Sequence, residues 1–209
     1  MTEPDVAITD YLLAIESLWL ATLLVAQPAG RADLQLWFVV FFAATGIASV
    51  LGGTFHGFCV AHPSHMGRWI WRKTVLAIGV TTSATWMIGA SMLWPGADTG
   101  WLTTMVAGEL IVFAAIVVFV TDAFRVAVIN HLPATIFLIV AYAMAYRAAP
   151  EPAVALGLAG LVLTIVAGLV QRLKAAVHPV YFTHNAVFHV LHGIALFLIF
   201  LSGRLLIAR

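Results

Sequence analysis

The sequence predicts an all-α protein, a polytopic bundle of about seven transmembrane helices. The composition is 63% hydrophobic and only 9% charged, whereas soluble domains carry roughly 25% charged residues. Seven apolar segments are each long enough to cross the hydrocarbon core, which takes about 20 residues of helix. These apolar runs are continuous, and the strands of an outer-membrane barrel would instead alternate apolar and polar residues. Helices are therefore expected, because they satisfy their own backbone hydrogen bonds in lipid.

Turn-forming residues divide the chain into its spans. In order, the predicted spans cover residues 8–27, 34–61, 69–93, 101–121, 123–146, 153–170 and 180–201. The breaks carry proline, glycine or charge: Gln27-Pro28-Ala29-Gly30, His62-Pro63-Ser64-His65, Trp94-Pro95-Gly96, Thr121-Asp122-Ala123, Ala149-Pro150-Glu151-Pro152 and His178-Pro179. The break at Asp122 is the shortest. No loop is long enough to form a soluble domain, so residues 1–209 are predicted to form one transmembrane domain.

Charge and cysteine content exclude several classes of protein. The first ten residues contain Glu3, Asp5 and Asp10 but no Lys or Arg, unlike the basic start of a cleavable signal peptide. We therefore expect the first apolar segment to be retained. One cysteine, Cys59, excludes an internal disulfide. The net charge of +1 gives no electrostatic case for binding nucleic acid.

Lys and Arg are distributed unequally between the two faces of the membrane. We call the face that holds the N-terminus side A and the opposite face side B. Side A is predicted to hold Arg68, Arg72, Lys73, Arg125, Arg172 and Lys174, and side B to hold Arg31, Arg147, Arg204 and Arg209. By the positive-inside rule this bias favours a cytoplasmic N-terminus in an integral, multi-pass protein.

All eight histidines are predicted to lie on side A or in the half-membrane beneath it. They are His56, His62, His65, His131, His178, His184, His189 and His192. Most acidic residues inside the spans agree, because Asp10, Glu16 and Asp122 lie toward side A, and Glu109 lies near mid-depth. Charged groups inside a membrane are costly and usually face the bundle interior. We therefore expect a polar cavity that opens toward side A.

The seventh span concentrates these polar residues. Asn185, His189 and His192 lie within roughly 60° of one another on one helical face. His184 lies roughly 140° from His189 but only about 80° from His192. His189 and His192 could share a metal ion with His56 from the second span, and three imidazoles with one open position are typical of catalytic zinc. The ordinary alternative is that these histidines tie helices together through hydrogen bonds.

Two short segments resemble a known family of membrane proteins. Thr183-His184-Asn185-Ala186-Val187-Phe188-His189-Val190-Leu191 resembles the seventh-span histidine motif of the progestin and adipoQ receptors. Phe55-His56-Gly57-Phe58-Cys59-Val60-Ala61-His62 is similar to the segment that closes their second span. Those receptors and the alkaline ceramidases form the CREST superfamily of seven-span metal hydrolases. The resemblance implies zinc at His56 and His189, with His184 or His192 as the third ligand, and attack of zinc-bound water on a lipid amide.

The resemblance also places the assisting residues. The family serine lies four residues before the second-span histidine, where this chain has Gly52, and Ser49 lies one turn earlier. The family histidines of the seventh span are four residues apart, and the position four before His189 is Asn185. No aspartate matches the family aspartate of the third span. Ser49 and Asn185, which lie nearest these family positions, and Glu16, an acidic residue of the first span, are the candidates for proton transfer or oxyanion stabilisation.

Two functional hypotheses remain open at this stage. The first is a zinc-dependent hydrolase of a lipid amide or ester, with membrane lipid as its partner and substrate. The second is a non-catalytic receptor or subunit of a larger membrane complex, in which the histidines bind haem, a chlorophyll-type pigment or another ligand. His56 with His189 or His131 would supply the two axial ligands of a haem.

Overall fold

The fold was taken from a computed structural model, which describes residues 1–61, 64–96 and 100–209. Across this part of the chain the structure is all α-helical, apart from one isolated bridge between His178 and Phe182. In chain order the helices are α1 Pro4–Ala26, α2 Ala32–Phe58, α3 His65–Leu93, α4 Gly100–Ala115 with its π-helical continuation η1 Ile116–Val120, α5 Phe124–Ala148, α6 Pro152–Arg172 and α7 His184–Ile207.

Seven helices in the described residues are long and apolar enough to cross a membrane, with α4 and η1 counted as one. The fold class predicted from the sequence is confirmed, and the chain is an integral, multi-pass membrane protein. The break between the fourth and fifth spans is also present, because Thr121–Ala123 lie outside both helices. His62 and Pro63, which the sequence placed in a turn, lie outside the described residues.

The helix ends differ from the predicted spans by a few residues. Helix α3 begins at His65 rather than near Trp69, because the Ser64 side chain caps it and accepts the Gly67 N–H at 3.0 Å. Helix α7 begins at His184 and continues to Ile207, one to two turns beyond the predicted end. Helices α1 and α6 both start at a proline, Pro4 and Pro152, where the missing N–H costs nothing.

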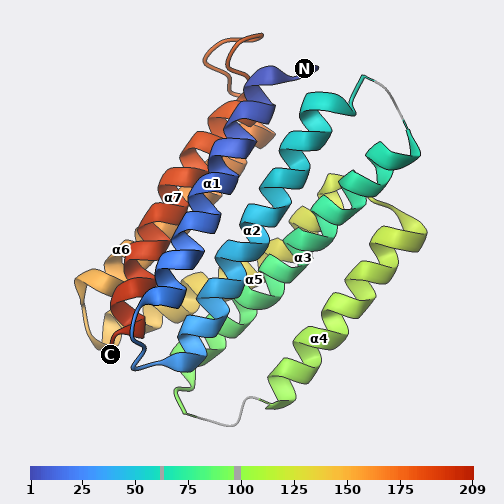
Figure 1. The fold of residues 1–209 in the computed structure, drawn as a ribbon. Helices are drawn as coiled ribbons and strands as arrows, with labels where there is room; N and C mark the ends of the chain where they lie inside the picture. The colour runs from blue at the N-terminus through green and yellow to red at the C-terminus, as the bar shows by residue number, and fades with distance from the viewer. Residues whose placement is uncertain (62–63, 97–99) are drawn as a thin grey trace.

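Six helices form a closed ring, in the order α1, α2, α3, α5, α6 and α7, and α7 returns to pack against α1. The two ends of the chain are thus adjacent, and α1 and α7 lie side by side in Figure 1. Helix α4 stands outside the ring against α3 (Figure 1). The main apolar core fills the ring, with Phe38, Phe42, Leu138, Leu196 and Phe200 among its most buried members.

Backbone bonds outside the helices hold the ring at both membrane faces. On side A the N–H of Glu3 donates to the His56 carbonyl at 3.2 Å, which places the start of α1 beside the end of α2. On side B the N–H groups of Gly30 and Arg31 both donate to the Ile207 carbonyl, at 2.9 and 3.0 Å. The relative depth of residues on α1, α2 and α7 is fixed by these contacts.

Candidate functional site

The most polar contact inside the ring joins α1 to α7 near side A. Nε2 of His189 lies 3.3 Å from Oδ1 of Asp10, and Nδ1 of the same ring lies 2.9 Å from the Thr9 hydroxyl. The side chains of His189 and Asp10 are 11% and 8% exposed. Both ring nitrogens of His189 therefore have partners, a hydroxyl on one side and a carboxyl group on the other.

Two glycines of α2 make room for Asp10. A Cβ atom added at Gly52 would lie 3.3 Å from Oδ2 of Asp10, and one added at Gly53 would lie 3.1 Å from its Cβ. Asp10 lies roughly 9 Å from the start of α1, since the helix rises 1.5 Å per residue. A larger residue at either position would compete with the carboxyl group for space, so the glycines allow this residue to sit at the α1–α2 contact.

A second acid–imidazole pair lies at the side A end of the bundle. Nδ1 of His56, in the last turn of α2, is 2.5 Å from Oε2 of Glu3. The side chains of His56 and Glu3 are only partly buried, so solvent weakens their attraction relative to the Asp10–His189 pair. Helix α1, through Asp10, and the residue just before it, Glu3, therefore supply a carboxyl group to each of the two histidines that the sequence comparison singled out.

A groove on the outer surface, between α1 and α7, runs past His189. Its volume is about 400 Å³, and it is lined by Thr9, Leu12, Leu13, Glu16, His189, Val190, Gly193, Ile194 and Phe197. Its polar members are Thr9, Glu16 and His189, and its apolar members include the exposed side chains of Leu12 and Ile194. These apolar side chains lie on a surface that lipid covers, so the groove is open to the hydrocarbon part of the membrane.

Glu16 lies two helical turns deeper in the groove than Thr9. A Cβ atom added at Gly193 would lie 2.8 Å from Oε2 of Glu16, so α7 leaves space for the carboxyl group at this level. Glu16 is one of the residues singled out from the sequence, and it shares the groove with His189. Ser49 is buried in α2. Asn185 accepts a hydrogen bond from Nε2 of Gln171, on α6, at 3.1 Å.

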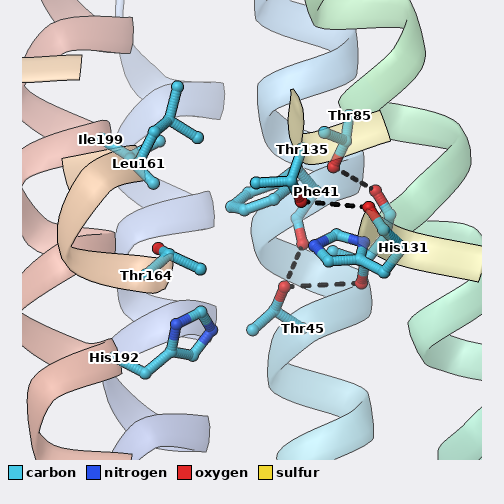
Figure 2. A pocket seen from close by; sticks show the side chains of 10 residues that line it. Phe41, Thr45, Thr85, His131, Thr135, Leu161, Thr164, His192 and Ile199 are labelled. Carbon is cyan, nitrogen blue, oxygen red and sulfur yellow. Dashed lines mark hydrogen bonds between the residues drawn. The ribbon is translucent and has the colours of Figure 1, made fainter. Parts of the chain in front are cut away.

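His192 faces a different space from His189. A cavity of about 30 Å³ inside the ring is lined by His192 together with His131 of α5 and five threonines. Figure 2 shows the two imidazoles on opposite sides of this cavity. The roughly 60° between His189 and His192 is enough to send one ring to the α1–α7 groove and the other to the interior.

The residues predicted to hold zinc are thus spread over separate contacts. His56 pairs with Glu3, His189 pairs with Asp10, His192 lines the interior cavity, and His184 lies at the first residue of α7. Among the described residues no three His, Cys, Asp or Glu side chains gather as a metal-binding group. The zinc site stays a prediction. The haem alternative, with His56 and either His189 or His131 as axial ligands, also stays a prediction.

Comparison with protein-family models gives a match over residues 6–208, almost the whole chain. The matching family is DUF6962, described as a family of unknown function. The chain belongs to DUF6962. No curated protein and no solved structure matches it.

Thr9, Asp10 and Glu3 are the site residues of this DUF6962 member that sequence reasoning did not select. Asp10 had been placed toward side A with the other acidic residues, but its partner was not identified. One signal was available, because Asp10 lies inside an apolar span, and Gly52-Gly53 in the next span leaves room for a polar neighbour. Thr9 gave no signal, since threonines are common in the spans of this DUF6962 member.

Proposed function

We propose that this protein is a membrane-embedded hydrolase of lipid esters or amides that acts through Thr9, His189 and Asp10. The observation that carries the proposal is the hydroxyl–imidazole–carboxyl order of these three side chains, of which Thr9 and His189 line a lipid-facing groove and Asp10 lies behind His189. The same order of groups activates the hydroxyl nucleophile in many hydrolases on unrelated folds, which are recognised by geometry rather than by sequence.

The proposed chemistry divides the roles among the three residues. The Thr9 oxygen attacks the carbonyl carbon of the lipid, and its proton passes to Nδ1 of His189. Asp10 orients the ring through Nε2 and stabilises the imidazolium that forms. His189 then gives the proton to the leaving alcohol or amine. Water, deprotonated by the same ring, hydrolyses the acyl-threonine and restores the free hydroxyl.

The Thr9 hydroxyl has more acceptors within reach than it has protons, so it can adopt a resting or a reactive hydrogen-bond arrangement. The Thr9 hydroxyl is 2.8 Å from the Asp5 carbonyl, 3.0 Å from the Val6 carbonyl and 2.9 Å from Nδ1 of His189. One proton cannot satisfy all three acceptors, so the hydroxyl donates to a backbone carbonyl or to His189. Donation to His189 is the reactive arrangement, because only then can the ring take up the proton.

The groove indicates the class of substrate. An acyl chain would lie along the apolar side chains of Leu12, Ile194 and Phe197, with its carbonyl at the level of Thr9. Glu16 lies about 10 Å deeper on the same helix, since seven residues separate it from Thr9. Its carboxyl group would accept a hydrogen bond from a hydroxyl or amide N–H of the lipid. The sequence prediction of a cytoplasmic side A would place the substrate in the cytoplasmic leaflet.

The test is lipid turnover by the purified protein in nanodiscs, measured as fatty acid released from a panel of ester and amide lipids. We expect Thr9→Val to abolish turnover and Thr9→Ser to retain it, because serine keeps the hydroxyl. Thr22→Val is the matched control, since Thr22 is an exposed threonine of α1 whose hydroxyl donates to the Trp19 carbonyl. Turnover that survives in folded Thr9→Val would overturn the role of Thr9.

The sequence resemblance predicts a second route to the same reaction, through zinc, and the carboxyl partners of His56 and His189 support it. The candidate ligands lie at separate contacts, so this route requires them to come together. Histidines that bind zinc usually hold a carboxyl group on their other ring nitrogen, as His56 does with Glu3. In this route His56 and His189 would bind about one zinc per chain, with His184 or His192 as the third ligand predicted from the resemblance. Ser49 and Asn185 would then assist.

Metal analysis separates the two routes. A threonine nucleophile needs no metal, so turnover should survive dialysis against a strong chelator. Loss of turnover on chelation, with recovery when zinc is added back, would favour the zinc route, and His56→Ala would then lower the bound zinc. Ser49→Ala would lower turnover in the zinc route and leave it unchanged in the threonine route.

A further inference from the structure

The cavity inside the ring, which we call the threonine–histidine cavity, has no role in the proposed reaction. It is lined by Phe41, Thr45, Thr81, Thr85, His131, Thr135, Leu161, Thr164, His192 and Ile199. The lining residues come from α2, α3, α5, α6 and α7, so the cavity lies at the centre of the ring. Its volume of about 30 Å³ holds at least one molecule of the size of water.

The five threonine hydroxyls are all placed to donate to the helix backbone. Each hydroxyl donates to the backbone carbonyl four residues earlier: Thr45 to Phe41, Thr81 to Ala77, Thr85 to Thr81, Thr135 to His131 and Thr164 to Gly160, over 2.8 to 3.2 Å. Figure 2 shows three of these bonds around the cavity. The hydroxyl oxygens of Thr45 and Thr81 also lie 3.4 Å apart, so one of these two can donate to the other instead. A hydroxyl that donates in this way keeps its lone pairs free, so the threonine oxygens offer the cavity acceptors rather than donors.

The hydrogen bonds of His131 also lead it to present an acceptor to the cavity. Nδ1 of His131 lies 3.0 Å from the Thr82 hydroxyl, and that hydroxyl donates to the Ile78 carbonyl at 3.0 Å. In the tautomer that matches this direction, the ring nitrogen is the donor to Thr82. A neutral imidazole carries one N–H, so Nε2 of His131 is an acceptor.

His192 supplies an unpaired polar atom from the other side. Its Nδ1 atom is buried and makes no hydrogen bond to any of the described residues. An unpaired buried polar group destabilises the fold, and a suitable ligand would remove that penalty. The lining residues include no carboxyl group, so a cation would have no counter-charge in the middle of the membrane.

We infer that the threonine–histidine cavity binds a small neutral hydrogen-bond donor, of the size of water or ammonia, between His131 and His192. Such a molecule carries two or more O–H or N–H bonds, one for each imidazole. Its own lone pair can accept a hydrogen bond if His192 carries its proton on Nδ1. An apolar molecule of the same size would leave every acceptor in the cavity unpaired.

The experiment is nuclear magnetic resonance of the full chain in nanodiscs with ¹⁵N-labelled histidine. We expect His131 to carry its proton on Nδ1, and magnetisation to pass from bound water protons to the ring nitrogens of His131 and His192. A parallel sample in ¹⁵N-ammonium buffer at alkaline pH distinguishes the source, because bound ammonia would add a cross-peak from its own protons. Contact with water or with ammonia supports the site.

Variants show whether the signal belongs to this cavity. Thr135→Val removes one lining oxygen and should weaken or abolish the cross-peaks. Thr104→Val is the matched control, because the exposed Thr104 also donates to the carbonyl four residues earlier but lies outside the cavity. Wild-type protein with no contact from water or ammonia to either ring would overturn the inference, as would a His131 ring protonated only on Nε2.

Discussion

Oδ1 of Asp10 lies 3.3 Å from Nε2 of His189, and this contact joins the first helix of the chain to the last. Both side chains are nearly buried, so water screens the pair weakly. Removing either side chain would leave the other buried without its partner. For buried pairs this lowers the free energy of unfolding by about 3–5 kcal/mol. The contact therefore has two expected consequences, one for the stability of the α1–α7 interface and one for the reactivity of the imidazole.

Asp10→Asn separates these two consequences, because asparagine keeps the size of the side chain and one hydrogen-bonding oxygen. We expect turnover to fall about 10²- to 10⁴-fold, since the ring loses the carboxyl group that orients it and stabilises its positive charge. The fold should persist. Steady-state turnover and thermal unfolding of the purified protein measure both effects.

The matched control is Glu3→Gln, which alters the other acid–imidazole pair, outside the groove. It should leave turnover within a factor of a few in the threonine route. Asp10→Asn combined with His189→Asn should lose little more than the worse single variant, because residues that act as a unit are not additive. If the double variant instead lost turnover by the product of the two single losses, Asp10 and His189 would not act as one catalytic unit.

Gly193→Leu tests whether the groove is where the lipid binds. The new side chain would occupy the space between Glu16 and Leu13, which a Cβ atom at Gly193 already approaches to 2.8 and 3.6 Å. We expect KM for lipid to rise at least several-fold, because the acyl chain loses its place. Gly168→Leu on α6 is the control, since a Cβ atom there meets nothing within 4 Å. Equal KM values for both variants would place the lipid elsewhere.

Depth along the helices could be predicted from the sequence, but the contacts between helices could not. Lipid demands long apolar helices, so the seven spans and the gathering of polar residues toward side A follow from composition and turns. Which residues meet depends on how each helix is rotated and on which helices are neighbours. Helix α4 lies outside the ring, and nothing in its apolar sequence distinguishes it from a ring helix.

His189 and His192 illustrate this limit. Helical phase placed them on one broad face, which made a shared metal ion reasonable. The ring closure of α7 against α1 turns His189 toward Thr9 and Asp10, and His192 faces the interior with His131. Asp10 was not predicted as a site residue for the same reason, since its partner His189 lies at the other end of the sequence.

Asp5 is expected to stabilise the start of α7. Its Oδ2 atom accepts the backbone N–H of Thr183 at 2.9 Å and the Thr183 hydroxyl at 2.7 Å. Asp5→Ala removes both bonds and should lower the free energy of unfolding by about 1–3 kcal/mol. Thr183→Val removes only the hydroxyl bond and should cost less.

Unfolding in sodium dodecyl sulfate, with the two single variants and the double variant, measures this coupling. The double variant should be no less stable than Asp5→Ala, because that variant has already lost the hydroxyl bond. Thr22→Val, on the exposed face of α1, should change stability by less than about 0.5 kcal/mol. A double variant that loses the full sum of the single effects would show that Asp5 and Thr183 act separately.

Gly157 of α6 is expected to tolerate replacement poorly. A Cβ atom there would overlap the ring of Tyr142 on α5 and approach Oγ of Ser202 on α7 to 2.6 Å. Tyr142 and Ser202 hydrogen-bond to each other at 3.0 Å in the core, so neither can move without breaking that bond. Gly157→Ala should destabilise the protein by about 1–3 kcal/mol through overpacking.

The same helix supplies the control, because a Cβ atom at Gly168 meets nothing within 4 Å. Gly168→Ala should stabilise α6 by up to about 1 kcal/mol, since alanine is the better helix former. Comparing the free energies of unfolding of Gly157→Ala and Gly168→Ala in one assay separates the effect of overpacking from the effect of helix propensity. Two alanine variants of equal stability would mean that Tyr142 moves aside at little cost and that the α5–α6–α7 contact is loosely packed.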